Sequence, residues 1–284
     1  MENPKYKELK NKIVVVTGGG GILCSTIANA FASQGATVCI LDLNIETAQE
    51  VSEQITKAGG KALAVQANVL DRESLQKAKN EIAEKVGLCD ILVNGAGGNH
   101  PLGTTTNPFL LEEDLHKTTE GFKTFFDLDV NGIQFVFNLN FIGTLLPTQI
   151  FSKDMIGRKD CSILNISSMN AFTPLTKIPA YSGAKAAVSN FTQWLAVHFS
   201  KVGVRVNALA PGFFLTDQNR SLLTNEDGGL TQRGMTIIGQ TPMERFGEPE
   251  DLIGATLWLS SNQSKFVTGI VVPIDGGFSA FSGV

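Results

Sequence analysis

Tyr181 and Lys185 stand four residues apart in a stretch of helical character, and Ser168 precedes them where an apolar run ends. Residues spaced this way lie on one face of a helix. A free tyrosine has a pKa of about 10, and a neighbouring cation favours the ionised phenol and lowers that pKa. A serine hydroxyl at the end of a strand can hold a substrate oxygen beside the phenol. These residue types predict a proton donor for carbonyl reduction, although Tyr-x-x-x-Lys alone is a weak signal.

Short apolar runs alternate with amphipathic stretches along most of the chain. They predict strands at 12–18, 36–43, 62–69, 90–98, 162–168, 204–212 and 269–277. They predict helices at 22–34, 45–59, 72–87, 135–156, 180–201 and 249–261. This alternation is typical of an α/β protein with a Rossmann-type, doubly wound parallel sheet of about seven strands and helices on both faces.

No linker-like or low-complexity segment divides the 284 residues, so we expect one dinucleotide-binding domain over 1–284. Two segments interrupt the alternation of strands and helices. Residues 98–134 predict an insertion with one or two short helices beside the fourth strand. Residues 213–247 are polar and predict an irregular loop, and we expect the two segments together to select the substrate.

A glycine-rich turn follows the first strand and opens the first helix. Glycines there let the backbone approach a pyrophosphate, and the helix N-terminus favours its negative charge. A glycine-rich turn without a ligand is the alternative, but the position directly after the first strand favours a cofactor. The candidate cofactor contacts in this turn are Gly18, Gly20, Gly21, Ile22 and Leu23.

Asp42 ends the second strand. A carboxylate at this place accepts hydrogen bonds from an adenosine ribose diol and repels a 2′-phosphate, which predicts NAD rather than NADP. Asp42 could instead serve the start of the next helix, a capping role that Asn44 can also fill.

Further candidates lie at the ends of later strands, where parallel α/β sheets bind their ligands. Asn140 is different, because an amide in mid-helix is unfavourable unless it bonds something inside the protein. The strand-end candidates for cofactor contact are Asn68, Val69, Asn94, Gly95, Ala96, Pro211, Gly212, Phe214 and Thr216.

Composition excludes several other classes of function. The net charge is −4 and no block of Lys or Arg stands out, so we expect no nucleic-acid partner. The polar first dozen residues and the lack of an 18-residue apolar run predict a cytoplasmic protein without a membrane partner. Four scattered cysteines and three distant histidines predict reduced packing thiols and no metal site.

Taken in order, these motifs resemble the short-chain dehydrogenase/reductase family over nearly the whole chain. The residues that carry the resemblance are Thr17-Gly18, Asp42, Asn68-Val69, Asn94-Gly95-Ala96-Gly97, Asn140, Ser168, Tyr181-x-x-x-Lys185, Pro211-Gly212 and Asp275-Gly276-Gly277. The resemblance implies a nicotinamide cofactor and usually a homotetramer formed through the long helices.

The same resemblance implies a role for each of four catalytic residues. Tyr181 would exchange a proton with the substrate oxygen. Lys185 would hold the nicotinamide ribose and lower the tyrosine pKa, and both residues would contact the cofactor. Ser168 would orient the carbonyl and Asn140 would anchor a water in a proton relay. Two departures concern the pyrophosphate region. Ile22 and Cys24 replace the last two glycines of the family's first motif, and Gly95 replaces the second asparagine of Asn-Asn-Ala-Gly.

A narrower resemblance is to the group assigned as D-mannonate oxidoreductases (fructuronate reductases), which is close to the gluconate 5-dehydrogenases. It rests on TGGGGILC, NGAGGNHP, TFFDLD, SSMNAFTPLTKIPAYS and PGFFLTDQNR. A sugar acid needs several hydroxyl partners and a cation for its carboxylate. Arg220 is the first candidate for that cation, since its planar fork matches a carboxylate. The polar residues expected around the site are Asn99, His100, Asn170, Lys177, Gln218, Asn219 and Arg220, each of which alone could be a solvated loop residue.

The sequence thus predicts an NAD-dependent oxidoreductase that acts on a CH–OH group of a sugar acid, D-mannonate/D-fructuronate first. A gluconate 5-dehydrogenase or another polyol or ketose reductase is an alternative. A catalytically silent dinucleotide-binding protein is another, although such a protein is expected to have lost one of the four catalytic residues. A ketoacyl-type or simple ketone reductase fits less well, because those enzymes commonly use NADP and apolar pockets.

Overall fold

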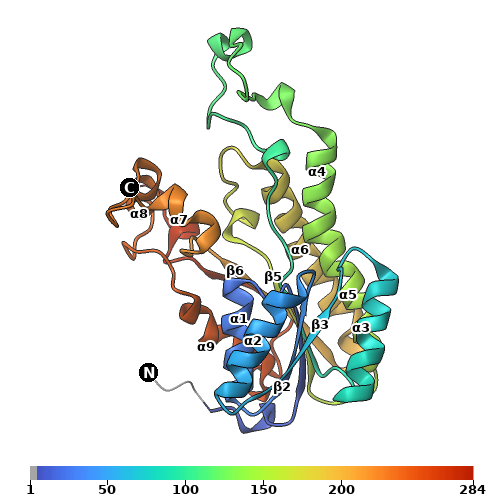
Figure 1. The fold of residues 1–284 in the computed structure, drawn as a ribbon. Helices are drawn as coiled ribbons and strands as arrows, with labels where there is room; N and C mark the ends of the chain where they lie inside the picture. The colour runs from blue at the N-terminus through green and yellow to red at the C-terminus, as the bar shows by residue number, and fades with distance from the viewer. Residues whose placement is uncertain (1–4, 284) are drawn as a thin grey trace.

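The computed structural model describes residues 5–283, and for residues 217–219 it describes the backbone only. Seven strands form one sheet in the order β3-β2-β1-β4-β5-β6-β7, and every neighbouring pair is parallel (Figure 1). The strands are β1 Ile13–Thr17, β2 Thr37–Asp42, β3 Lys61–Gln66, β4 Ile91–Asn94, β5 Cys161–Ile166, β6 Val204–Pro211 and β7 Val271–Ile274. The predicted doubly wound α/β sheet is confirmed.

Helices cover both faces of the sheet. Alternate residues of a strand point to opposite faces, so Val14 and Val16 of β1 pack on one side while Val15 packs on the other. The first side is covered by α1 Ile22–Ser33, α2 Ile45–Lys57 and α9 Ile253–Ser260. The second is covered by α3 Arg72–Lys85, α5 Gly143–Phe151 and α6 Pro179–His198. This burial on both faces explains why the central strands are apolar runs without polar alternation.

The long helix predicted over 135–156 is present, but it begins at Val130, ends as an α-helix at Phe151, and contains a π-helical turn. The chain forms α4 Val130–Phe137, then a π-helical turn at Asn138–Ile142, then α5. Asp129 caps α4 by accepting a hydrogen bond from Gly132 N at 3.0 Å. Gly132 is a weak helix former, which hides this first turn from a periodicity argument. The wider π-turn carries Asn140 and interrupts the regular hydrogen-bond ladder at this residue.

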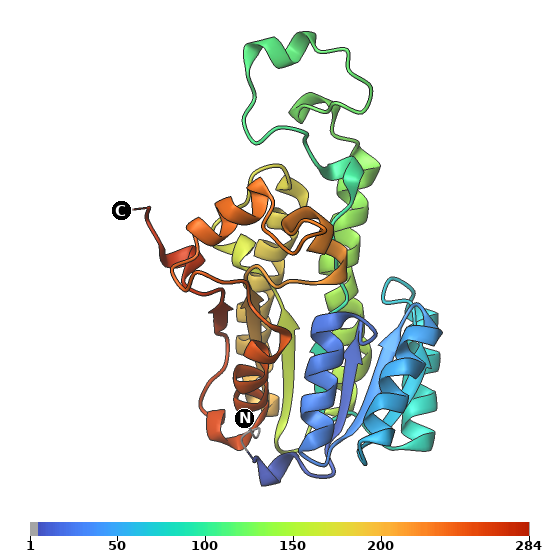
Figure 2. The same cartoon turned by 60° about the vertical axis from the view of Figure 1, so that its left-hand side comes forward.

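Residues 104–129, here termed the arm, extend away from the sheet beside α4 (Figures 1 and 2). They hold only short 3-10 turns at Glu112–His116 and Phe125–Asp127, after a similar turn at Pro101–Gly103. These turns agree with the short helices expected in 98–134.

The prediction that 213–247 is irregular is wrong in part. Two helices form there, α7 Asp217–Leu223 and α8 Gln232–Gly239. Thr231 caps α8 by accepting a hydrogen bond from Gly234 N at 3.1 Å. Both helices are short and contain polar or glycine residues, so they give little periodic signal. They lie above the carboxyl ends of the strands, across from the arm side of the molecule (Figure 2).

Candidate active site

The catalytic candidates meet beyond the carboxyl end of β5. Ser168 lies two residues after this strand and caps a short turn, its Oγ accepting a hydrogen bond from Asn170 N at 3.2 Å. Tyr181 and Lys185 share one face of α6, with Lys185 Nζ 5.6 Å from the centre of the Tyr181 ring. Lys185 Nζ also donates to Ile166 O, the last residue of β5, at 2.8 Å. The strand end and the helix are therefore tied together through the buried lysine.

Burial controls the proton affinities of this pair. It raises the pKa of Tyr181, and hydrogen bonding with the Ser168 hydroxyl opposes that rise. It also lowers the pKa of Lys185 to about 8, because an ammonium loses its hydration inside the protein. The expected lowering of the tyrosine pKa by Lys185 is therefore not found in this state. The lysine's own charge is disfavoured, and desolvation of the phenol outweighs any attraction from it.

Asn140 has a defined role in shaping the site. It is fully buried, and its Nδ2 donates to Val136 O and to Gly98 O, both at 2.7 Å. Its Oδ1 accepts from Gly98 N at 3.2 Å. The amide thus pairs with both backbone groups of Gly98, which explains the side chain in mid-helix. This pairing fixes the loop after β4 against α4.

Gly97 has a steric role that the sequence motif alone did not assign. A Cβ atom at this position would lie 2.6 Å from Asn140 Oδ1 and 3.2 Å from Lys185 Nζ. The loop after β4 therefore passes so close to both catalytic candidates that only glycine fits. The signal in the sequence was the glycine spacing of Asn94-Gly95-Ala96-Gly97.

The turn between β1 and α1 forms a backbone cradle. Gly18 has a φ of 64°, and a Cβ on it would lie 2.8 Å from Ala96 Cα. A Cβ on Gly20 would lie 2.3 Å from Thr47 Oγ1. Gly21 stands at the N-cap of α1 and offers no side-chain cap, so the first-turn N–H groups of Ile22 and Leu23 can face a phosphate. The cradle fits the pyrophosphate of a dinucleotide.

Asp42 closes this cradle at the end of β2. Its Oδ2 accepts a hydrogen bond from Gly20 N at 3.0 Å, and its Oδ1 accepts from Asn44 N at 3.1 Å. Asn44 itself caps α2 by accepting from Glu46 N at 2.9 Å. The capping role considered for Asp42 is thus filled by Asn44, and the half-buried carboxylate of Asp42 remains beside the glycine turn.

Two predicted cofactor residues have their side chains in structural positions. The Asn94 amide donates to Thr148 Oγ1 and Asn165 Oδ1 at 2.9 and 2.8 Å, so it braces the sheet. Phe214 is buried in the core and packs against Gly247. Internal contacts hold the Asn94 Nδ2 and the Phe214 ring, so a cofactor contact at these two residues stays a prediction that concerns their backbones first. Their backbones still lie at the strand ends.

The other strand-end candidates shape the rim of the site. Asn68 Oδ1 accepts from Leu70 N at 2.9 Å and turns the chain after β3. Val69 is buried against Gly143, and Gly212 passes close to Asp275. Pro211 ends β6. Thr216 O accepts a hydrogen bond from Arg220 N at 2.8 Å at the start of α7. Gly95 and Ala96 donate their N–H groups to Thr17 Oγ1.

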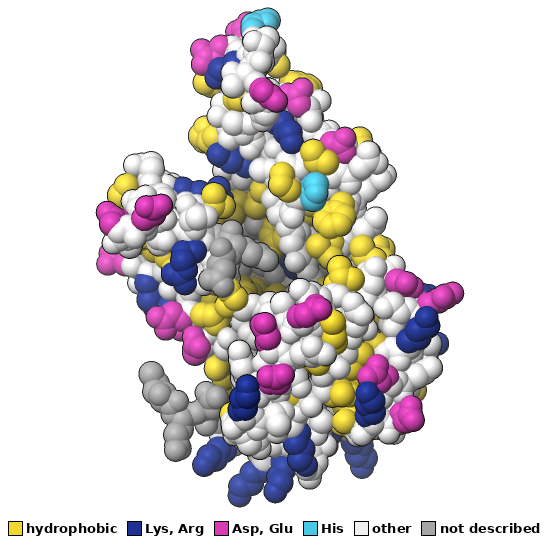
Figure 3. All heavy atoms as spheres, viewed as in Figure 1, with side chains coloured by type: hydrophobic (Ala, Val, Ile, Leu, Met, Phe, Trp, Pro, Cys, Tyr) yellow, Lys and Arg dark blue, Asp and Glu magenta, His cyan; other side chains and the backbone are white. Residues whose placement is uncertain are grey.

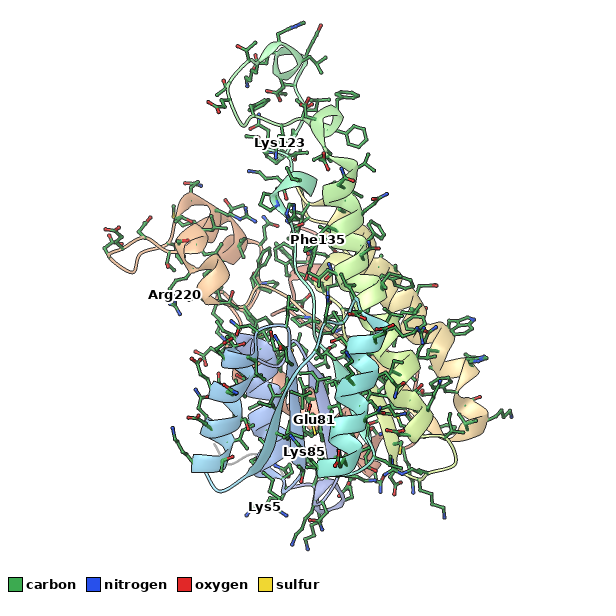
Figure 4. The ribbon with its side chains drawn as sticks, turned by 45° about the vertical axis from the view of Figure 1, so that its right-hand side comes forward. Lys5, Glu81, Lys85, Lys123, Phe135 and Arg220 are labelled. Atoms are coloured by element: carbon green, nitrogen blue, oxygen red, sulfur yellow. The ribbon has the colours of Figure 1, made fainter. Side chains whose placement is uncertain are left out.

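The surface is hollowed between the α4 side and the α7–α8 side of the molecule (Figure 3). The candidate substrate residues come from several separate segments. Asn99 donates its amide to Thr104 Oγ1 at 2.9 Å, and His100 Nδ1 accepts from Leu102 N at 3.2 Å. Arg220 lies on α7, across from Phe135 on α4 (Figure 4). Asn170 lies two residues after Ser168, in the short turn that Ser168 caps. The side chains of Gln218 and Asn219 lie outside the described residues.

Lys177 lies at a second cavity, beside the arm. It has a φ of 72°, and its carbonyl accepts from Thr105 N at 2.9 Å. The cavity holds about 310 Å³ and is lined by the arm and by residues 174–179. The residues that line this cavity include neither Gly18 and Asp42 of the cradle nor Ser168.

Three further properties bear on the class of protein. Within residues 5–283, no group of three or more His, Cys, Asp or Glu side chains is arranged to hold a metal ion. All four cysteines are buried and free. None of the helices in the described part of the chain is both long and apolar enough to cross a membrane.

Comparison with known proteins agrees with this architecture. The short chain dehydrogenase family model matches residues 12–227. An uncharacterized oxidoreductase of Haemophilus influenzae is 57% identical over 277 residues, covering 97% of this chain and 96% of that protein. A second uncharacterized oxidoreductase, UxuB of Bacillus subtilis, is 51% identical over 282 residues and is covered to 99%, as is this chain.

A solved structure from Haemophilus is also similar. It is 56% identical, has a TM-score of 0.92, and matches over 97% of this chain and 98% of its own. That protein is provisionally assigned as a D-mannonate oxidoreductase and was crystallised with bound NAD. With the parallel sheet, the glycine cradle and the Ser-Tyr-Lys cluster in place, the chain belongs to the short-chain dehydrogenase family of oxidoreductases.

Proposed function

We propose that this protein is an NAD-dependent oxidoreductase that interconverts a keto and a hydroxy group on a sugar acid, D-mannonate/D-fructuronate first. The observation that carries the proposal is the convergence of Ser168, Tyr181 and Lys185 beside the dinucleotide cradle. The similar Haemophilus protein, with its provisional D-mannonate assignment and bound NAD, supports both the cofactor and the substrate.

In this proposal a nicotinamide bound in the cradle supplies or accepts the hydride. Tyr181 donates the proton to the carbonyl oxygen during reduction and receives it during oxidation. Its raised pKa keeps the phenol protonated before substrate arrives, which suits a donor. The Ser168 hydroxyl holds the substrate oxygen near the phenol. Lys185, anchored on Ile166 O, is placed to hold the nicotinamide ribose.

The preference for NAD over NADP is proposed from Asp42. Its carboxylate stands next to Gly20 and so at the adenosine end of the cradle. A 2′-phosphate there would meet a like charge, whereas a ribose diol would donate hydrogen bonds to it. In this proposal the protein selects NAD mainly because the Asp42 carboxylate repels the 2′-phosphate of NADP.

The proposed substrate class rests on the polar residues near the ends of the strands and on α7. Arg220 on α7 is the proposed partner of the substrate carboxylate, and Asn170 is placed beside Ser168. A gluconate 5-dehydrogenase or another ketose reductase remains the alternative substrate class. The distinction lies in the number and stereochemistry of the substrate hydroxyls.

Steady-state assays test the proposal directly. We expect the protein to reduce fructuronate with NADH faster than it reduces tagaturonate, 5-ketogluconate or a ketone without an acid group. Tyr181→Phe should lower kcat by roughly 10²- to 10⁴-fold, the usual contribution of a positioned proton donor, while NADH still binds. Turnover confined to ketones without an acid group would contradict the sugar-acid assignment. Full activity of the Phe variant would contradict the role of Tyr181.

A homotetramer is the proposed assembly, with copies of this chain as partners. The outer face of α6 leaves Trp194 and Val197 exposed by 56% and 76%, and Phe266 before β7 is fully exposed. Burying such side chains between copies removes apolar surface from water. No nucleic-acid partner and no membrane partner is proposed.

A further inference from the structure

We infer that Asn170 is a specificity-determining residue that binds a hydroxyl on the carbon next to the reacting carbon. The substrate class would therefore be an α-hydroxy ketone and the matching vicinal diol. This inference deepens the proposed function and rests on its assignment of Ser168 and Tyr181 to the reacting oxygen.

The first argument is the unused hydrogen-bonding capacity of Asn170. The residue is 5% exposed, and its Oδ1 has no hydrogen-bond partner among the described residues. Buried polar atoms in proteins are nearly always paired, and an unpaired one in a site calls for a missing partner. An amide can accept from a hydroxyl through Oδ1 and donate through Nδ2, so a hydroxyl satisfies it well.

The second argument is the position of Asn170 relative to the reacting oxygen. Its backbone N–H donates to Ser168 Oγ at 3.2 Å. The same Ser168 hydroxyl lies near enough to the Tyr181 phenol to oppose the rise of its pKa. A substrate oxygen held by Ser168 and Tyr181 therefore has Asn170 as its neighbour in the same short turn. The next oxygen along the substrate skeleton, one carbon away, is the group that Asn170 can reach.

The third argument is that two other polar candidates have their side chains occupied. The Asn99 amide donates to Thr104 Oγ1 at 2.9 Å. His100 uses Nδ1 to cap the turn after it, and its ring packs 5.1 Å from the ring of Phe135. Because internal contacts hold these groups, binding a substrate through them would cost the contacts already made. Asn170 carries no such cost for its Oδ1.

A residue-by-substrate cycle tests the inference. The probes are 1-hydroxybutan-2-one and butan-2-one, which differ by the hydroxyl next to the carbonyl, each assayed with NADH. We expect the wild-type kcat/KM to favour the hydroxy ketone by at least tenfold. Asn170→Leu, which keeps the branching at Cγ and the backbone N–H to Ser168 but removes the amide, should reduce this preference to near unity. Its kcat/KM for butan-2-one should change less than threefold.

The matched control is Asn80→Leu on the exposed face of α3, where Asn80 Oδ1 accepts from Gln76 Nε2 at 2.9 Å; it should keep the wild-type preference. Asn170→Asp, which still accepts a hydroxyl hydrogen, should retain part of it. Equal losses on both ketones in Asn170→Leu, or a wild type with no preference, would overturn the inference. Near-UV circular dichroism shows whether Asn170→Leu folds normally. If it does not, the kcat/KM ratios of the two ketones for Asn170→Asp and Asn170→Ser decide the test.

The outcomes separate this inference from the proposed function. Suppose the preference for the hydroxy ketone depends on Asn170, but the protein turns over no sugar acid. That result would contradict the proposed substrate and leave the role of Asn170 intact. Turnover of fructuronate combined with an unchanged preference in Asn170→Leu would contradict the role of Asn170 alone.

Discussion

Cys24 Sγ occupies the space that a side chain at position 95 would need. A Cβ atom on Gly95 would lie 2.1 Å from Cys24 Sγ, while it would lie 3.7 Å from Cys24 Cβ. Both residues depart from the usual family pattern, in which a glycine stands at the first position and an asparagine at the second. The two departures are therefore one exchange of volume between the first turn of α1 and the loop after β4. They preserve the close contact between the two halves of the cradle.

A double-mutant cycle at these positions should show strong coupling. Gly95→Ala alone should destabilise the protein by about 1–3 kcal/mol, since it overpacks a buried contact. Cys24→Ala alone should cost about 1 kcal/mol through the small void it leaves. The double variant should recover part of the Gly95→Ala loss, because the added methyl then meets the Cβ at position 24 at an ordinary distance, while its 3.0 Å approach to Thr17 O remains. Urea unfolding measures all three, and additive losses would contradict the exchange.

The buried Lys185 should make stability depend on pH. Its pKa is about 8 in the folded protein, below its value of 10.5 in a free chain. Between these values the unfolded chain binds more protons, so stability rises with pH from about 8 to 10.5. Below pH 8 both states are charged and the full burial cost applies, on the order of 3 kcal/mol from the size of the shift.

Lys185→Met removes this ionisation at similar size. The stability of this variant relative to the wild type should fall as the pH rises from 7 to 10, when measured by urea unfolding without cofactor. Loss of the hydrogen bond to Ile166 O lowers the stability of the variant by the same amount at every pH. It does not change how the difference in stability varies with pH. A pH-independent difference between the two proteins would show that Lys185 titrates normally.

Asp42 should set the choice between the two nicotinamide cofactors. Asp42→Asn keeps an acceptor for Gly20 N but removes the charge that would repel a 2′-phosphate. We expect NAD to bind about tenfold more weakly and the NAD/NADP affinity ratio to fall by roughly 10- to 100-fold, the range for a charged hydrogen bond. Fluorescence titration with each cofactor measures this without turnover. Asp71→Asn, the same change at the cap of α3, is the control and should leave the ratio unaltered.

The exposed face of α6 should mediate assembly. Val197→Glu places a charge on a side chain that is 76% exposed in the isolated chain, so folding of the chain should be unaffected. Association should weaken at least tenfold, or about 1.4 kcal/mol, because the charge would be buried between copies. Light scattering after size exclusion should report a tetramer for the wild type and smaller species for the variant. Leu88→Glu, an apolar-to-acidic change away from α6, should leave the tetramer intact; a monomeric wild type would refute the assembly.

The sequence by itself determined the sheet, the order of the motifs and the class of reaction. Strands buried on both faces must be apolar runs, and glycines and hydroxyl or amide residues follow them at fixed places. Those local signals are sufficient to bring Ser168, Tyr181 and Lys185 to one edge of the sheet. The mid-helix Asn140 likewise signalled an internal partner, because an isolated amide is unfavourable there.

Only the tertiary structure decided which atoms those residues contact. Asn140 bonds to Gly98, and Cys24 fills the space beside Gly95, through contacts between segments distant in sequence. The same is true of the internal contacts that hold the Asn94 and Phe214 side chains. The same holds for proton affinity, because burial of Tyr181 and Lys185 outweighs the attraction expected from their spacing. Helical spacing determines which side chains are neighbours, but desolvation depends on everything packed around them.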